Sequence, residues 1–317
     1  MAALTGVSVK PRLQIRRQDF HRPDGLAHSE LVTKITHGQA GRTAEEFNVM
    51  SDFEGEERTL PFTEHNQGEN VTVLLIHGAF SNDEEWDMVT PHLTNYHLLI
   101  PDLPGHGKAS AIRPFSKHLA AKLIANTITQ HAKDGKAHII ALSLGAYIAI
   151  DLSVRYPAVV RDMFISGIKV LPILRGPLVP YLMYLNCNLQ KLIPKTLIDQ
   201  AMDGTDVHST ASTELSVSLC REVLYPISLA DDYSWPDPWK ARTLIVCAGK
   251  SDLLPTNDSE ADTVHMRDIA RTLNPETTAV VNAQIRHPWN RQKPELFAEA
   301  AKAWFERREI PDEFRPL

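Results

Sequence analysis

A serine on a tight turn is the first residue whose setting in this sequence indicates chemistry. Ser143 follows the apolar run His138–Leu142 and precedes a segment with helical periodicity. The residues two before and two after it, Ala141 and Gly145, are small, as they must be where larger side chains would collide across the turn. A hydroxyl there lies at the carboxyl end of a strand and near a helix N-terminus, which favours developing negative charge. The pattern indicates a nucleophilic serine; the alternative is an ordinary N-cap serine.

A serine nucleophile needs a base to take its proton, and the base needs a carboxylate to orient it. His287 and Asp252 are the candidates, because each follows a strand-like run and the loops after parallel strands gather at one sheet edge with Ser143. Asp258 and Asp262 are nearby rivals, but they lie further from the end of the strand. With 14 histidines in the chain, a late histidine alone decides little. The joint match, in the order serine, aspartate, histidine, predicts a catalytic triad.

An acyl-transfer site also needs hydrogen-bond donors for the oxyanion that forms on the attacked carbonyl. The dipeptide His77-Gly78 ends an earlier buried strand, and a turn there can aim a backbone N–H at the serine. We expect the N–H groups of Ala79 and Leu144 to form the oxyanion hole, with Phe80 as a second choice for the first donor. We expect His77 to hold the turn by a hydrogen bond rather than to take part in catalysis.

The elements that must position these residues follow from apolar periodicity. Continuous apolar runs typical of buried parallel strands alternate with segments of helical spacing, which predicts an α/β fold with a mostly parallel sheet and helices on both faces. Two short alternating segments near the N-terminus predict an edge hairpin. The strand-like runs are 71–78, 98–107, 137–145, 163–167, 243–249 and 278–285, the helical segments are 115–133, 144–156 and 294–308, and the hairpin strands are 31–38 and 45–50.

One segment breaks this alternation. Residues 168–236 are rich in Leu, Pro, Tyr and Met and predict an inserted, mainly helical cap. The prolines and the arginine within 169–199 exclude a membrane span. We therefore divide the chain into a flexible N-terminal segment, a first core part, the cap and a second core part, with the bounds 1–29, 30–167, 168–236 and 237–317.

The apolar cap suggests an apolar ceiling over the serine, and hence a lipophilic substrate. We expect Phe80, Tyr181 and Tyr184 to bind it. Two alternatives stay open: the apolar residues of the cap only pack it onto the core, or the cap is a lid that touches a membrane surface.

These motifs together resemble the α/β-hydrolase superfamily, over about residues 60–308. The resemblance is closest to small single-domain members with an HGxxxxxxxW stretch, here ending at Trp86. It implies an eight-stranded, mostly parallel sheet with a helical cap after the sixth strand, and it supports the Ala79 N–H as a donor. Haloalkane dehalogenases and epoxide hydrolases of this fold carry Asp at the turn, so Ser143 argues against both. The carrying residues are His77–Ala79, Pro101–Gly107, Ala141–Gly145, Asp252 and His287.

Composition sets the outer limits. The chain has 317 residues, 43% apolar and 23% charged, which is typical of a globular protein with a sizeable core and excludes a disordered, collagen-like or coiled-coil chain. A net charge of −6 argues against a nucleic-acid partner. Three scattered cysteines predict neither a disulfide framework nor a metal site, and hence a reducing compartment. The basic N-terminus weakly resembles a transit peptide, but a solvated tail is the simpler interpretation, and we expect a cytoplasmic protein.

The sequence thus predicts a serine hydrolase of the carboxylic ester hydrolase type. It would cleave a carboxylic ester, lactone or thioester of a lipophilic small molecule through an acyl-enzyme on Ser143, without metal or cofactor. The alternatives use the same triad for carbon–carbon bond hydrolysis, acyl transfer or lyase chemistry, or make the protein a non-catalytic ligand receptor. We expect no stable membrane insertion, and the oligomeric state is not predicted.

Overall fold

In the computed structural model, eight strands form a single sheet within the compact unit Glu57–Leu317. The structure describes residues 57–169, 177–190, 192–194, 205, 215–227, 235–250 and 257–317. The strand order is β1-β3-β2-β4-β5-β6-β7-β8; the two edge strands are antiparallel to their neighbours, and the six inner strands are parallel. The strands are β1 (Phe62–His65), β2 (Thr72–Ile76), β3 (His97–Pro101), β4 (Ala137–Leu142), β5 (Val160–Ser166), β6 (Thr243–Ala248), β7 (Thr278–Asn282) and β8 (Arg315–Pro316).

The inner strands coincide with the six apolar runs of the sequence. Every residue of β2, β3 and β6 is buried, because helices cover both faces of a parallel sheet. The sequence gives no comparable signal for β1 and β8. These edge strands are short and partly or fully exposed, so no apolar run marks them.

Local signals explain where several helices begin. The hydroxyl of Ser116 accepts a hydrogen bond from Leu119 N at 3.1 Å and caps α3, and Ser259 caps α8 in the same way. Pro294 opens α10, where the missing N–H costs nothing. The α-helices are α3 (Lys117–His131), α4 (Leu144–Arg155), α5 (Val179–Gln190), α7 (Val217–Ile227), α8 (Glu260–Arg271), α9 (Trp289–Gln292) and α10 (Pro294–Phe305), and the short 3₁₀ helices are η1 (Asp83–Trp86), η2 (Thr90–His92), η3 (Gly107–Ala109) and η4 (Lys133–Gly135).

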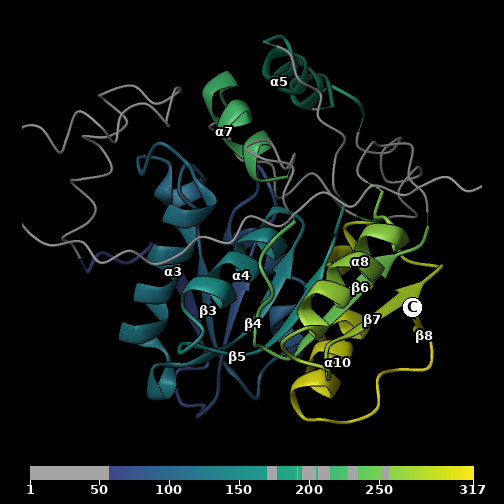
Figure 1. Cartoon of the computed structure of the whole chain (residues 1–317). Coiled ribbons are helices and arrows are strands. Elements are labelled where there is room, and N and C mark those ends of the chain that lie inside the picture. The colour runs from purple at the N-terminus through teal and green to yellow at the C-terminus, as the bar shows by residue number, and fades with distance from the viewer. Residues whose placement is uncertain are drawn as a thin grey trace, which may run out of the picture. The chain divides into compact units, whose positions relative to one another are not determined.

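Two layers of helices cover the sheet. On one face α3, α4 and α8 bury residues such as Ile124, Ile148 and Met266 against the strands, and these helices lie in front of the sheet in Figure 1. On the other face η1, α9 and α10 contribute Trp86, Trp289 and Phe297 to a second core.

Helices α5 and α7 lie in the segment between β5 and β6, as the predicted helical insertion requires. In the described sheet this is after the fifth strand rather than the sixth. The boundaries of the insertion stay a prediction, since much of 168–236, like the N-terminal segment and the predicted hairpin, lies outside the described residues. Among the described helices, none has the length and apolar character needed to cross a bilayer.

Candidate active site

Ser143 occupies the strained turn that the sequence predicts. It joins β4 to α4 with φ 55° and ψ −120°, a left-handed conformation that is costly for a residue with a side chain. Its N–H donates to Ser166 O at 2.9 Å, which ties the turn to β5. Its side chain makes no capping hydrogen bond to α4, so the ordinary N-cap interpretation does not apply.

Two glycines make this turn possible. A Cβ on Gly145 would lie 2.4 Å from Ile76 O, so only glycine lets α4 start so close to β2. Gly167, with φ 84°, follows β5, and a Cβ there would lie 2.8 Å from both His287 Cε1 and Ser143 N. Because both atoms would lie 2.8 Å from the same point, His287 Cε1 and Ser143 N are at most twice 2.8 Å apart. Sequence reasoning assigns no functional role to Gly167, whose only signal is a glycine directly after a strand.

His287 is paired with Asp258. Its Nδ1 lies 2.6 Å from Asp258 Oδ1, and the Asp258 side chain is fully buried. The other oxygen, Oδ2, accepts from Ala248 N at 2.9 Å at the end of β6. A catalytic triad would require Nε2, the other ring nitrogen, to face Ser143. No hydrogen bond of Ser143 Oγ is present among the described residues; such contacts commonly tighten only when substrate binds.

Asp252, the acid that the sequence favours, lies outside the described residues, and its assignment stays a prediction. Asp258, its named rival, is the carboxylate that contacts His287 in the described part of the chain. Distance from the end of the strand was the argument for Asp252. The ten-residue gap between Ala248 and Asp258 does not keep Asp258 away, because its carboxylate folds back onto Ala248 N.

The turn after β2 is held by His77. This side chain is fully buried, and burial lowers the pKa of His77 to about 4, so the imidazole is neutral. Leu103 N donates to its Nε2 at 3.0 Å, which places the proton on Nδ1, and Nδ1 donates to Gly78 O at 2.7 Å. His77 therefore orients the turn, as the sequence predicts.

The two predicted oxyanion-hole donors are free of protein acceptors. Across the described residues, neither Ala79 N nor Leu144 N has a hydrogen-bond acceptor. Leu144 begins α4 directly after Ser143, where the N–H groups of a helix are unpaired by geometry. Phe80, the second choice for the first donor, has φ 63° and marks the sharpest point of the turn.

A buried acid that the sequence analysis did not single out stands beside this turn. Glu85, on η1, is 7% exposed, and its Oε2 accepts from Gly78 N at 2.7 Å. Burial raises the pKa of Glu85, while the hydrogen bond from Gly78 N–H and the positive charge of Arg291 act in the opposite direction. Its position just before Trp86, in a polar stretch, gave no sign of burial.

The loop after β3 is held by hydrogen bonds to the turn after β2 and within itself. Asp102 is 1% exposed; its carboxylate accepts from Asp83 N at 2.8 Å and from Lys108 N at 2.7 Å, and burial raises the pKa of Asp102. A Cβ on Gly107, which has φ 43°, would lie 2.4 Å from that carboxylate. The motif Pro101–Gly107 thus has a structural cause.

The predicted substrate-binding residues are only partly placed at the site. Phe80 lies on the turn after β2, and the centroid of its ring is 6.3 Å from that of His106. Tyr181 and Tyr184 lie on α5, where they are 53% and 37% exposed. Their role in binding substrate stays a prediction.

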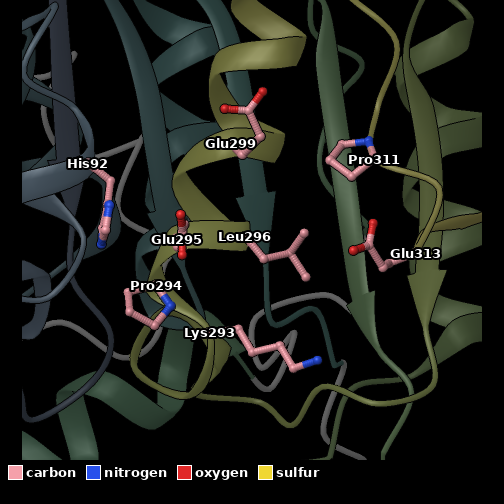
Figure 2. A pocket seen from close by; sticks show the side chains of 8 residues that line it. All are labelled: His92, Lys293, Pro294, Glu295, Leu296, Glu299, Pro311 and Glu313. Atoms are coloured by element: carbon pink, nitrogen blue, oxygen red, sulfur yellow. The ribbon is translucent and has the colours of Figure 1, made fainter.

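A surface groove of about 570 Å³ lies away from these residues. Figure 2 shows it between the first turns of α10, His92 of η2 and the C-terminal segment near Pro311. Ser143 and His287 do not line it. Within the described part of the chain, no three His, Cys, Asp or Glu side chains are arranged to hold a metal ion.

The family follows from comparison with known proteins. A model described as "Alpha/beta hydrolase family" matches residues 73–301, a stretch that contains Ser143, Asp258 and His287. The chain belongs to the alpha/beta hydrolase family. This confirms the predicted fold and makes the protein a hydrolase by class.

Relatives of this alpha/beta hydrolase include a protein named AB hydrolase superfamily protein from Gibberella zeae, 30% identical over 271 residues, or 82% of this chain and 89% of the relative. A pimeloyl-[acyl-carrier protein] methyl ester esterase from Neisseria meningitidis is 38% identical over 96 residues, covering 30% of this chain and 35% of that enzyme. A solved lipase-esterase related protein from Clostridium acetobutylicum shares the fold, with a TM-score of 0.56, 18% identity and coverage of 77% and 98%.

Proposed function

We propose that this alpha/beta hydrolase is a serine esterase that cleaves a carboxylic ester, lactone or thioester of a lipophilic small molecule. The observation that carries the proposal is that Ser143 N and His287 Cε1 both lie beside Gly167, while Asp258 contacts Nδ1 of His287. A nucleophile, a base and an orienting carboxylate in this arrangement are the requirements of acyl transfer through a serine.

In the first half-reaction Ser143 Oγ attacks the ester carbonyl and gives its proton to His287 Nε2. The oxyanion that forms accepts hydrogen bonds from Ala79 N–H and Leu144 N–H. When the carbon–oxygen bond breaks, His287 returns the proton to the departing alcohol, which leaves an acyl-enzyme on Ser143. In a lactone the alcohol stays tethered to the acyl group, and in a thioester a thiol leaves.

In the second half-reaction water gives a proton to His287 and attacks the acyl carbonyl. The same two N–H groups hold the second oxyanion. Collapse returns the proton to Ser143 Oγ and releases the carboxylic acid. Asp258 holds His287 in the Nδ1–H tautomer and stabilises the imidazolium in both halves.

The names of relatives support an ester as the substrate, since one aligned protein is a methyl ester esterase. The apolar side chains of α5, together with Phe80, support a lipophilic acyl or alcohol group. Three free cysteines and the predicted cytoplasmic location are compatible with this proposal.

The test is a panel of p-nitrophenyl esters from acetate to octanoate, assayed with the wild type and with Ser143→Ala. We expect kcat/KM to rise with chain length and to fall by about 10³-fold or more in Ser143→Ala. Ester turnover that survives in Ser143→Ala would overturn the mechanism. A protein that hydrolyses none of the esters but still reacts at Ser143 with a fluorophosphonate would use its triad for another reaction.

A further inference from the structure

We propose that Glu85 is a positioning residue for the oxyanion hole: its carboxylate holds Gly78 so that the next N–H, that of Ala79, faces the carbonyl attacked by Ser143. This inference rests on the proposed function, because it assigns a role to a residue outside the triad in that same reaction. It adds a buried acid to the site that neither the sequence motifs nor the family match assigns.

Gly78 lies close to both Glu85 and Ser143. Gly78 N donates to Glu85 Oε2 at 2.7 Å. A Cβ on Gly78 would lie 3.5 Å from Ser143 Cβ and 3.6 Å from each carboxylate oxygen of Glu85. The Glu85 carboxylate therefore lies beside the turn that also approaches Ser143.

Two hydrogen bonds fix Gly78 from opposite sides. Glu85 holds its N–H, and His77 Nδ1 holds its carbonyl oxygen at 2.7 Å. Gly78 C=O and Ala79 N–H belong to the same planar peptide unit and point in opposite directions. Anchoring the carbonyl on His77 consequently turns the Ala79 N–H away from His77. The Gly78 N–H belongs to the preceding peptide unit, so its hydrogen bond to Glu85 fixes the backbone on the other side of the Gly78 Cα.

Glu85 is itself held by the segment that follows the catalytic histidine. Asn290, in α9, donates through Nδ2 to Glu85 O at 3.2 Å. α9 begins two residues after His287. Asn290 thus holds the main chain of Glu85, while the Glu85 carboxylate holds Gly78, so this residue links α9 to the turn after β2.

Burying a carboxylate is unfavourable unless its oxygens are hydrogen-bonded, and the raised pKa of Glu85 reflects that cost. A donor that is preorganised before reaction stabilises the transition state more than the substrate. We therefore expect loss of the acceptor to lower kcat and to leave KM nearly unchanged. A residue needed only for folding would not produce this separation.

The experiment compares Glu85→Met, which keeps the volume but removes the acceptor, with Glu85→Gln, which keeps an oxygen for Gly78 N–H. We expect Glu85→Met to lower kcat about 10- to 100-fold with KM within about threefold, and Glu85→Gln to recover most of that loss. Binding of a trifluoromethyl ketone, whose adduct carries an oxyanion, should weaken in Glu85→Met by the same factor as kcat. Glu84→Met, at the exposed neighbouring position, is the matched control.

A kcat for Glu85→Met within threefold of the control would overturn the inference, and so would a Gln variant as slow as the Met variant. If Glu85→Met fails to fold, Glu85→Asp replaces it, because the aspartate side chain is one methylene shorter and its carboxylate does not reach Gly78 N. The same fall in kcat is expected. Failure of the proposed function is separable: it would appear as an active Ser143→Ala variant, whatever the Glu85 variants do.

Discussion

His287 depends on a carboxylate that is anchored at both oxygens. Asp258 Oδ1 faces Nδ1 of the imidazole at 2.6 Å, and Oδ2 accepts from Ala248 N at 2.9 Å. A buried carboxylate held in this way cannot turn to another partner, so the imidazole keeps one orientation and one tautomer. This is the property that a triad acid supplies.

The first prediction separates the two candidate acids. Replacing Asp258 by Asn makes the side chain a poor acceptor for the His287 Nδ1–H, and we expect kcat to fall by about 10³-fold or more. Asp252→Asn should cost much less. Steady-state kinetics on a p-nitrophenyl ester measures both, with thermal melting as a check on folding. A larger loss from Asp252→Asn would return the role of acid to Asp252.

Gly167 gives a second prediction at the same scale. With φ 84° and no space beside His287 Cε1 and Ser143 N, an alanine there is strained and separates the base from the nucleophile. We expect Gly167→Ala to lower kcat/KM by at least about 100-fold. Gly68→Ala, whose new methyl group meets nothing within 4 Å, is the control. Equal activities of the two variants would contradict this account of Gly167.

At the scale of elements, α7 is joined to the core by the carboxylate of Glu222 and by buried apolar side chains. Glu222 accepts from Arg113 Nη2 at 2.7 Å and from Phe115 N at 2.7 Å, and Leu219 packs beside Gly105. These contacts join the helical insertion to the loop that follows β3. By contrast, α5 exposes most of its large apolar side chains.

We predict that Glu222→Ala lowers the free energy of unfolding by about 1–3 kcal/mol, because it removes the acceptor of Phe115 N and the carboxylate partner of Arg113. Urea unfolding measures this value. Arg221→Gln, an exposed position on the same helix, should change it by less than about 0.5 kcal/mol. The account of the anchor is wrong if the two variants are equally stable.

The inner sheet could be predicted because each of its strands carries its own signal. The apolar runs that become β2 and β6 are buried on both faces, and after the threonine that opens each strand no polar residue interrupts it. β1 and β8 could not be predicted, since an edge strand of two to four residues needs partners rather than an apolar sequence. α8 was also missed, because its many charged residues conceal the buried positions of Thr263 and Met266.

The site divides along the same line. Ser143 could be predicted because it directly follows β4 and carries a local steric pattern, and His287 because it comes soon after the apolar run 278–285. Asp258 and Glu85 reach the site from positions that the chain brings back: ten residues after β6 in one case and inside a polar 3₁₀ helix in the other. Contacts of this kind are set by tertiary folding, so spacing alone does not reveal them.

At the scale of the whole molecule, buried histidines tie stability to pH. Burial lowers the pKa of His77 to about 4, of His106 to about 3 and of His138 to about 4, all below the ordinary value of 6.5. The unfolded chain therefore binds more protons than the folded protein below pH 6.5. Their contribution to stability is complete above that pH and is lost as the pH falls towards 4.

His138 allows this to be measured away from the active site, since it lies on β4, stacked on Phe305 at 4.4 Å. We predict that the free energy of unfolding falls between pH 7 and pH 5 by about 1–2 kcal/mol more in the wild type than in His138→Gln. Urea unfolding at the two pH values gives the comparison. Identical falls would mean that His138 titrates normally in the folded protein.

The central claim is that Ser143 carries the acyl group during turnover. Its most direct test is reaction with a fluorophosphonate, followed by digestion and location of the adduct by mass spectrometry. We predict a single adduct on Ser143, no adduct in Ser143→Ala, and labelling at least about 100-fold slower in His287→Ala. An adduct on another residue, or labelling of Ser143 at the full rate without His287, would contradict the account.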